Sequence, residues 1–532
     1  MTQSQGATVI QESVKRTDPI PLLEPAGAEV SPATFEISLP KVEPQTYVDK
    51  TSLPFEDIPG PAILKIWEKY WKYVPLIGTQ LFCSVLINRF TQGRLSWNRN
   101  VTPINYLFDE YGPIVRINGP LVSDIVMIHR PEHVAEVLKQ EGDTPIRSGI
   151  DILQHYRLHH RKYRLAGPFS LQGSEWLDVR EKVEEHFNQV AYDFFNKIDM
   201  VCDELIGRIR IIRNRQEEVP PNFSQELVRW GMECFSTLMF NKHIGFLEPA
   251  SYNSTSESAT IINALTTAHT YLNRCETGFQ VWRFFETPFA KKLFAACDVL
   301  DGLIGKYVRQ AQSKLRNKSS YSYKDELFVF DESSPILEKF LLDERVHPDD
   351  ICTLLLDMII LGVQAVIKEW KYKNYYKLRG ISAIFSCEES KVTEKYAIPE
   401  SLLRPAFPYI TRLLPKGITL HGYTIPKGTF IVMANQITSQ RNENFEDPNK
   451  YWPERWLLNQ TQEELPEFSY LPFGYGMRSC LGKSMAETEM MLLTAKLVRQ
   501  FRIEYDYADI KSKFLMVNVP NKSLRFRFVD RD

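Results

Sequence analysis

The sequence predicts a mainly α-helical fold with small β-sheets. Windows such as Val190–Ile212 and Ser224–Phe240 alternate apolar and charged residues at helical spacing. The stretch Ile351–Val366 is apolar along its length and is long enough for a helix that crosses a whole domain. Two short segments, 419–434 and 524–528, instead show the alternation and the turn residues of strands. Helices should therefore dominate the fold.

Length, charge and cysteine usage exclude several classes of protein. The chain has 532 residues, of which 43% are hydrophobic, so it can bury an extensive core as one large domain or as two. Its formal net charge of -2 gives no global electrostatic basis for binding nucleic acid. The 8 cysteines have no paired spacing, which argues against a disulfide framework and favours a reducing compartment.

The N-terminal segment 1–56 is rich in Pro, Ser, Thr and Glu and has no hydrophobic period, so we expect it to be disordered. It contains no run of about 18 apolar residues, which predicts no N-terminal membrane anchor. Acidic residues outnumber basic ones up to Glu43, unlike a mitochondrial leader. The later apolar stretch 74–78 is interrupted by Pro and Gly, which suits peripheral contact with a membrane surface. The folded body should span 57–532.

The interval 181–345 should be helical and should cover a substrate site. Its aromatic and apolar residues either line a pocket for a bulky apolar substrate or belong to the core; they are Tyr271, Phe279, Val281, Trp282, Phe284 and Phe285. Farther on, Pro348, Asp349 and Asp350 suit a helix N-terminus, because proline lacks the unpaired N–H and carboxylates face the positive end of the dipole.

Strands are expected in the last quarter of the chain. Apolar residues before and after the turn Pro426–Gly428 predict a hairpin over 419–434. The alternation of Leu524–Phe528 predicts a half-exposed strand.

A glycine-rich loop, Pro472–Gly482, places Cys480 directly before an apolar helical stretch. Glycine permits torsions and close approaches that a Cβ forbids, so this loop can lie flat against a planar cofactor with Cys480 facing a metal. A cysteine at a helix N-terminus is also favoured as thiolate. Arg478 suits an acidic group of the cofactor. These features predict a haem-thiolate site with Cys480 as the axial ligand of the iron.

The loop resembles the cysteine-ligand signature of the cytochrome P450 monooxygenases at five positions, namely Phe473, Gly476, Arg478, Cys480 and Gly482. A lone buried cysteine is usually an inert core residue, and the matched pattern argues against that interpretation. From Gly60 onward the resemblance covers nearly the whole chain. It implies the cytochrome P450 fold, a catalytic domain over 57–532, haem (iron protoporphyrin) as cofactor and oxidation of an apolar substrate.

The resemblance also implies partners for the haem propionates. Trp176 and Arg180 lie four residues apart, hence on one helix face, and both should reach a propionate. Taken alone, such a pair is commonplace and is usually a solvated face. By resemblance, Arg412 is a further propionate ligand, and Phe473 and Arg478 complete the cofactor-binding set.

The helix expected above the haem departs from the family pattern. Family members carry a small residue, Gly, any residue, an acid and two hydroxyl residues, whereas this chain has Leu361–Val366. Gly362 and Gln364 occupy the catalytic positions, and the acid–alcohol pair that delivers protons is absent. Ordered water can substitute for it.

The segment 367–400 is atypical. It has no clear amphipathic period, and alignment puts Pro399 and Leu402 where the family has the Glu and Arg of a Glu-x-x-Arg motif. Arg455, the expected partner of that motif, would then lack its ion pair. We therefore expect part of the distal helix and the helices after it to be disrupted, and we attribute the segment to a different exon, retained intron sequence or a faulty gene model.

Within the family, the chain looks most like the mitochondrial class, which takes electrons from a small acidic ferredoxin. Lys483 follows the cysteine loop where this class carries a basic docking residue, although a solvated lysine is an equal alternative. The segments 156–161 and 362–366 further resemble the arthropod ecdysteroid 20-hydroxylases. This resemblance implies a steroid such as ecdysone as substrate and a location on the matrix side of the mitochondrial inner membrane.

Three functions remain open at this point. The chain is a ferredoxin-dependent steroid monooxygenase, a catalytically impaired or inactive variant of such an enzyme, or a haem-thiolate isomerase that needs no external proton relay. A reduced carbon-monoxide difference spectrum separates the second from the others, and product formation dependent on dioxygen separates the first from the third.

Overall fold

The chain divides into two compact units, Met1–Lys50 and Thr51–Asp532. The computed structural model describes residues of the second unit: 52–61, 103–119, 122–188, 191–253, 255–277, 280–321, 335–368, 405–449, 466–507, 512–515, 517–520 and 522–531. The expectations for 1–51, 74–78, 369–404 and 450–465, which include the missing Glu-x-x-Arg motif and Arg455, lie outside these residues.

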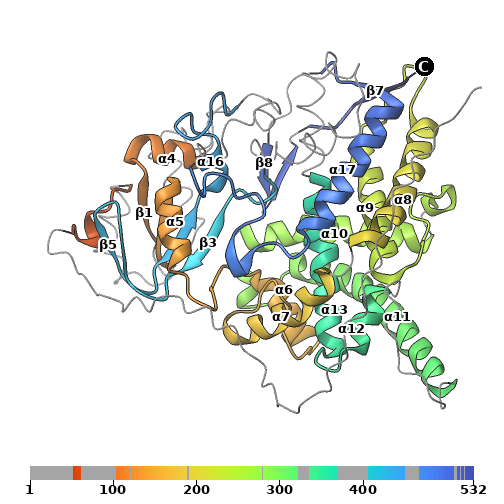
Figure 1. The fold of residues 1–532 in the computed structure, drawn as a ribbon, viewed down its shortest axis with the longest axis horizontal. Coiled ribbons are helices and arrows are strands. Elements are labelled where there is room, and N and C mark those ends of the chain that lie inside the picture. Colours follow the sequence, from red (N-terminus) through yellow and green to blue (C-terminus); the bar gives the residue numbers. More distant parts are fainter. Residues whose placement is uncertain are drawn as a thin grey trace, which may run out of the picture. The chain divides into compact units, whose positions relative to one another are not determined.

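Helices account for most of the described residues, as predicted (Figure 1). The α-helices are α4 (Pro103–Tyr111), α5 (Pro131–Lys139), α6 (Asp151–His155), α7 (Gly173–Asn188), α8 (Ala191–Ile212), α9 (Phe223–Phe240), α10 (Glu257–Thr277), α11 (Pro288–Tyr321), α12 (Ile336–Leu342), α13 (Pro348–Asp357), α16 (Asn435–Ser439) and α17 (Lys483–Gln500). Short 3-10 turns are η1 (Phe55–Asp57), η3 (Pro249–Tyr252), η4 (Val281–Arg283) and η9 (Gly476–Arg478), and π-helical turns are η2 (Tyr156–His160) and η5 (Met358–Val363).

The strands form one four-stranded sheet and three two-stranded ones. The larger sheet has the order β1-β2-β6-β3, formed by β1 (Ile114–Gly119), β2 (Val122–Ile128), β6 (Phe430–Met433) and β3 (Ile410–Leu413). In it β2 and β6 run parallel, and the outer pairs are antiparallel. The smaller sheets pair β4 (Ile418–Leu420) with β5 (Tyr423–Ile425), β7 (Phe501–Glu504) with β10 (Arg527–Asp530), and β8 (Ser512–Leu515) with β9 (Val517–Pro520).

The hairpin predicted over 419–434 is wrong in its pairing. The hairpin is β4–β5, and its turn is His421 and Gly422, which both adopt positive φ angles. The predicted turn Pro426–Gly428 instead carries the chain into β6, which pairs with β3 in the larger sheet. Local apolar runs predict strands, but the choice of partner is set by contacts distant in sequence.

The predicted alternation at the C-terminus is confirmed. Leu524, Phe526 and Phe528 are buried in the main helical core, whereas the side chains of Arg525 and Arg527 are partly exposed. At the other end of the described chain, Leu53 exchanges backbone hydrogen bonds with Gly422 and Thr424.

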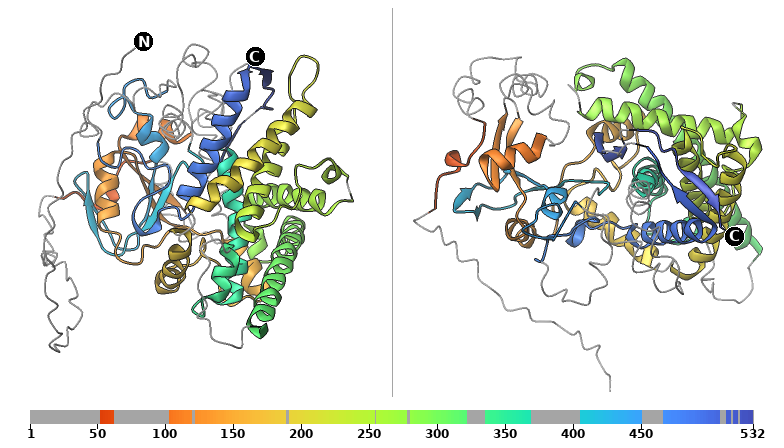
Figure 2. Two further views of the ribbon diagram at one scale, coloured as in Figure 1. Left: turned by 45° about the vertical axis from the view of Figure 1, so that its right-hand side comes forward. Right: turned by 90° about the horizontal axis from the view of Figure 1, so that it is seen from above.

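The main core lies among the long helices. Figure 1 shows α17 beside α8, and α8 also packs against α9. In Figure 2 the green helices α10 and α11 lie side by side, in agreement with their extensive contact. Two smaller apolar clusters form beside the larger sheet and its flanking helices α4, α5 and α16. The long helices and the sheet β7–β10 therefore share the main core, while the larger sheet has two smaller clusters beside it.

The predicted apolar rod forms one helical run from Pro348 to Lys368. His347 caps it by accepting a hydrogen bond from the Asp349 N–H, and Pro348 opens it as expected. Length and composition would allow this run to cross a membrane, but 61% of its most apolar window is buried inside the protein, as in a core helix. The π-helical turn η5 interrupts it; such turns are frequent at functional sites.

Candidate active site

The cysteine loop has the backbone that its glycines predict. Gly474 and Gly476 adopt φ angles of +76° and +64°, which disfavour any residue with a Cβ. A Cβ on Gly476 would also lie 2.8 Å from Oε1 of Glu141. The Cys480 N–H donates to the Phe473 carbonyl at 2.9 Å and closes the loop just before α17. The fold therefore presents the Cys480 thiol at the end of a rigid, tightly turned segment.

The electrostatics of Cys480 correct one expectation. Burial is the largest effect and raises the pKa of the thiol, although the Gly482 N–H and the charges of Arg180 and Arg147 act in the opposite direction. This effect runs against the thiolate that the helix N-terminus favours. Cys480 is nevertheless exposed to solvent, although much protein surrounds its thiol. Iron coordination removes a thiol proton outright, which suits such a position.

Trp176 and Arg180 share one face of α7, as their spacing predicts. The Arg478 guanidinium stacks on the Trp176 ring at 3.6 Å from its centroid. Arg180 donates from Nη1 to the Ser479 carbonyl at 2.7 Å and also makes a forked ion pair with Glu184. Both predicted residues therefore contact the cysteine loop directly and fix its position on the helix.

Arg478 joins the cysteine loop to the segment 145–172. Its Nε donates to the Pro145 carbonyl at 2.8 Å, and its Nη2 donates to the Leu171 carbonyl at 3.1 Å and to Oε1 of Gln172 at 2.9 Å. Its Nη1 is buried and has no hydrogen-bond partner among the described residues. This guanidinium is held firmly and retains one donor for an anionic group.

Arg412 lies in β3 and is almost completely buried, at 2% exposure. It forms an ion pair with Glu141 and also donates to the Thr411 carbonyl. Because Glu141 also touches the loop at Gly476, this pair connects the larger sheet to the cysteine loop. The structure thus places Arg412 near Arg478, although the two residues are distant in the sequence.

Sequence reasoning missed Arg147. Its guanidinium packs on the Phe169 ring at 4.2 Å, its Nη2 donates to the Phe169 carbonyl, and its Nε is buried without a partner among the described residues. Burial, and then the charge of Arg412, lower the pKa of Arg147 to about 10, while the fields of Asp357 and Cys480 oppose this shift. Arg147 lies in an irregular loop, so neither periodicity nor motif spacing signals it.

The charges of this cluster do not balance. Five guanidinium groups, those of Arg147, Arg157, Arg180, Arg412 and Arg478, face three carboxylates among the described residues, Glu141, Glu184 and Asp357. Burial, and then repulsion from Arg147, Arg412 and Arg180, lower the pKa of Arg478 to about 9. The excess of two positive charges is costly without an anion. The two propionates of haem carry the matching charge, so the residues fit this cofactor.

A buried ion pair links the same segment to the distal helix. Arg157 Nη2 lies 2.6 Å from Oδ1 of Asp357, and Oδ2 of Asp357 accepts the Phe169 N–H at 3.0 Å. Arg157 Nη1 also donates to the Ala166 carbonyl at 2.6 Å. Gly167 has a φ of +88°, and a Cβ there would lie 2.5 Å from Arg157 Nη1. Asp357 directly precedes η5, so the π turn begins at an anchored residue.

Gly362 and Gln364 lie at the C-terminal end of this π turn. Gly362 is exposed inside a mostly buried helix, and among the described residues no atom outside its own stretch of helix lies within 4 Å of the position that a Cβ would take. Gln364 is buried, at 9% exposure. Among the residues that the structure describes, nothing packs against the distal helix at Gly362, whereas the side chain of Gln364 is enclosed.

The aromatic residues suggested for a substrate pocket separate into two groups. Trp282 is buried and donates from its indole to the Cys275 carbonyl at 3.1 Å, as a core residue would. Phe284 and Phe285 are exposed at the surface and do not line a pocket. Phe279 lies outside the described residues. When residues on one side of a turn are buried, those on the other side are exposed. The sequence does not show which side faces the core.

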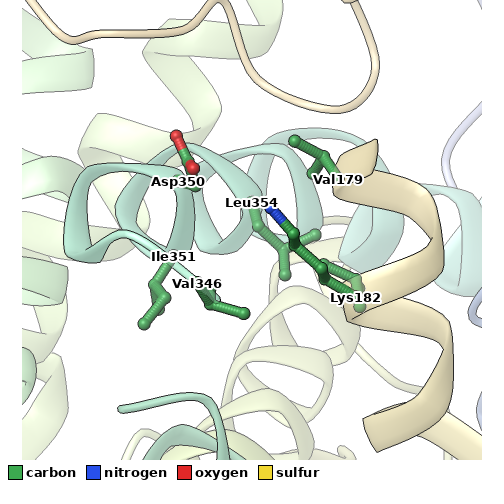
Figure 3. Close-up of a pocket in the computed structure, with 7 residues that line it drawn as sticks. Val179, Lys182, Val346, Asp350, Ile351 and Leu354 are labelled. Atoms are coloured by element: carbon green, nitrogen blue, oxygen red, sulfur yellow. The ribbon is translucent and has the colours of Figure 1, made fainter. Parts of the chain in front are cut away.

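Lys483 is exposed at the first position of α17, with its ammonium 5.9 Å from the centroid of the Phe473 ring. A small cavity of about 10 Å³ lies between α7 and α13 (Figure 3). It is lined by Val179, Lys182, Val183, Val346, Asp350, Ile351 and Leu354. That volume holds at most one water molecule, so this cavity is no substrate site.

Comparison with known proteins agrees with this geometry. A model of the family described as Cytochrome P450 matches residues 81–366 and 395–528. The interval 367–394 between the matches falls inside the segment that the sequence marks as atypical.

Several curated insect proteins are similar over most of the chain. A Musca domestica protein named Cytochrome P450 CYP12A2 is 29% identical and covers 84% of this chain and 89% of its own length. A Drosophila melanogaster protein named Probable cytochrome P450 12a5, mitochondrial, is 28% identical, with coverages of 90% and 91%. Ecdysone 20-monooxygenase of the same fly is 24% identical, with coverages of 89% and 88%.

The fold is also found among solved structures. The haem domain of cytochrome P450DA superposes with a TM-score of 0.64 at 15% identity, covering 83% of this chain and 95% of that one. Similarity at this level of identity establishes the fold and nothing finer.

Proposed function

This chain belongs to the cytochrome P450 family, and from that premise we propose that it hydroxylates a steroid such as ecdysone, using dioxygen and electrons from a ferredoxin. Proteins of this family and fold are haem-thiolate monooxygenases. The observation that carries the assignment is the buried excess of two positive charges beside Cys480. No other group of described residues combines a single accessible thiol with unpaired buried donors in this way.

The side chains around Cys480 divide the work of holding haem. When bound, the haem supplies one-electron and dioxygen chemistry that its axial ligand tunes. Cys480 would supply the thiolate that holds the haem iron, and Arg147, Arg412 and Arg478 would hold the propionates through charge-assisted hydrogen bonds. Trp176 keeps the Arg478 guanidinium in place by stacking against it. Phe473 and Arg180 fix the two ends of the loop that carries the ligand.

Among the described residues, Gly362 leaves room next to the distal helix. Gln364 is the polar side chain nearest to it in sequence, and neither Ala365 nor Val366 can carry a proton. We therefore assign proton delivery to ordered water beside Gln364, because a bridging water replaces a direct hydrogen bond at little enthalpic cost.

A steroid substrate is supported by resemblance at two levels. The segments 156–161 and 362–366 resemble the arthropod ecdysteroid 20-hydroxylases, and a fly ecdysone 20-monooxygenase is similar along most of the chain. Relatives named mitochondrial support a location in that organelle, on the matrix side of the inner membrane. Peripheral contact with that membrane is supported by Phe284, Phe285 and Phe289, which are 81%, 61% and 47% exposed around the start of α11.

Reversing the charge of Lys483 tests the ferredoxin partner. We expect Lys483→Glu to slow electron transfer from an acidic ferredoxin roughly tenfold at low ionic strength, because a charge at the rim of an interface acts on the association rate. The defect should shrink as salt is added, since the Debye length falls to about 8 Å at physiological ionic strength. Stopped-flow reduction of the haem measures both effects.

Lys427→Glu is the matched control for charge. Lys427 is equally exposed but lies in the turn between β5 and β6. If the two variants are slowed equally, or if the Lys483→Glu defect is independent of salt, Lys483 does not dock the ferredoxin.

A catalytically impaired variant is the second candidate function. The family match is interrupted at 367–394, and the distal helix lacks the acid–alcohol pair. This candidate predicts a chain that folds around its helical core yet turns over no substrate.

One experiment separates the two candidates. The purified chain, reduced under carbon monoxide, should show the thiolate-type band, and with a ferredoxin, its reductase and dioxygen it should convert ecdysone to a hydroxylated product detected by mass spectrometry. A chain that shows the band but forms no product with ecdysone or other steroids contradicts the proposed hydroxylation. Absence of the band would mean that this chain does not hold haem by Cys480.

A further inference from the structure

The π turn η5 interrupts the backbone hydrogen bonding of the distal helix. In an α-helix the Ile360 carbonyl would accept the N–H of Gln364, four residues on. Here the Gln364 N–H bonds to the Leu361 carbonyl instead. Ile360 is fully buried, so its carbonyl depends on partners within the protein. A buried carbonyl that lacks a partner costs free energy comparable to a lost hydrogen bond.

A side chain from another helix supplies the donor. His269 of α10 places its Nε2 in hydrogen-bonding contact with the Ile360 carbonyl. Because the acceptor is a carbonyl, Nε2 must carry the hydrogen. Burial, and then the charge of Lys368, lower the pKa of His269 to about 3, so the ring remains neutral at physiological pH. The neighbouring side chains on the distal helix, those of Leu361, Val363, Ala365 and Val366, are apolar. His269 is therefore the side-chain donor to this carbonyl among the described residues.

The π turn ends beside Gly362, where none of the described residues packs against the helix. We propose that His269 is a positioning residue that holds the π turn of the distal helix and thereby sets the room beside Gly362 for the substrate. Without its hydrogen bond, the Gln364 N–H can return to the Ile360 carbonyl, and the turn relaxes toward α-helical geometry with less room there. The inference rests on the proposed monooxygenase function only for the identity of what occupies that room.

Two substitutions separate the hydrogen bond from the bulk of the ring. His269→Phe keeps a ring and removes the donor, whereas His269→Gln places an amide N–H close to the position of Nε2. The asparagine of His269→Asn is polar but too short to reach the Ile360 carbonyl. This variant replaces His269→Phe if the Phe variant does not accumulate. Thr270→Val is the matched control, because Thr270 is exposed and its hydroxyl bonds only within α10, to the Thr266 carbonyl.

Two measurements on the haem-loaded protein report on the conformation of the π turn η5. We expect amide hydrogen exchange over 358–366 to quicken about fivefold in His269→Phe, the equivalent of about 1 kcal/mol, and to recover in His269→Gln. In difference spectra, affinity for bulky 4-phenylimidazole should fall about fivefold, by the same free energy, while affinity for imidazole changes little. Thr270→Val should match the parent protein in both.

Exchange and 4-phenylimidazole affinity that stay within twofold of the parent in His269→Phe would overturn the proposal. So would equal losses in the Phe and Gln variants, since the ring and not the donor would then matter. A parent protein without a thiolate-type band would remove the proposed function, and hydrogen exchange would still decide the role of His269.

Discussion

Replacing Cys480 with serine abolishes the thiolate-type band of the reduced carbon-monoxide difference spectrum; this is the largest effect that we expect from any single change. A serine hydroxyl does not ionise at neutral pH and donates far less electron density to iron than sulfur does. The change is nearly isosteric, so the loop, closed by the backbone bond to the Phe473 carbonyl, should persist. Product formation should be lost together with the band.

Cys352→Ser is the matched control for this chemistry. Cys352 is also a free, partly exposed cysteine, but it lies on α13, and burial raises the pKa of its thiol to about 12. Its substitution should leave the band unchanged. Haem content by extraction and circular dichroism should accompany both spectra, so that loss of the ligand is distinguished from loss of the fold. A persistent band in Cys480→Ser removes Cys480 from the site.

The features that sequence could predict are those that are local. The cysteine loop is contiguous, and its Gly474 and Gly476 have the positive φ angles that their presence suggested. Trp176 and Arg180 share a helix face because the spacing of an α-helix requires it. The start of the distal helix at Pro348 follows from the chemistry of helix N-termini.

The features that sequence could not predict depend on contacts between distant segments. Arg147 belongs to the site only because Arg478 and Asp357 bind the segment 145–172 from two sides. The strand after Pro426–Gly428 pairs with β3 for a similar reason. The pKa of Cys480 depends on how much protein surrounds it, which outweighs the local effect of the helix N-terminus. His269 was missed because its partner is a backbone carbonyl of another helix.

The second large effect concerns the buried ion pair of Arg157 and Asp357. We expect Asp357→Ala to lower the free energy of unfolding by about 3–5 kcal/mol, because removing one member of a buried pair leaves the other charge uncompensated. Arg157 is fully buried and Asp357 nearly so. The Phe169 N–H also loses its acceptor. Denaturant titration of the haem-loaded protein, followed by circular dichroism, measures the change.

A surface pair provides the matched control. Asp178 and Lys182 are also an aspartate paired with a cation, but the Asp178 side chain is mostly exposed, at 59%, and that of Lys182 is partly exposed, at 24%. Asp178→Ala should cost no more than about 0.5 kcal/mol, because exposed pairs four apart on a helix contribute little. Equal losses at both sites would mean that burial does not set the cost, and the account of this pair would be wrong.

The double variant Arg157→Met, Asp357→Leu tests whether the charges themselves stabilise the fold. An apolar pair of similar volume leaves no buried charge, so the double variant should be more stable than Asp357→Ala. It should still be impaired in the haem spectrum, because Asp357 also holds Phe169, and Phe169 supports the Arg147 guanidinium beside the cysteine loop. Stability recovered without a normal spectrum would show that the pair is retained to place the arginine against the cofactor. Recovery of both the stability and the haem spectrum would mean that the Arg157–Asp357 pair has only a structural role.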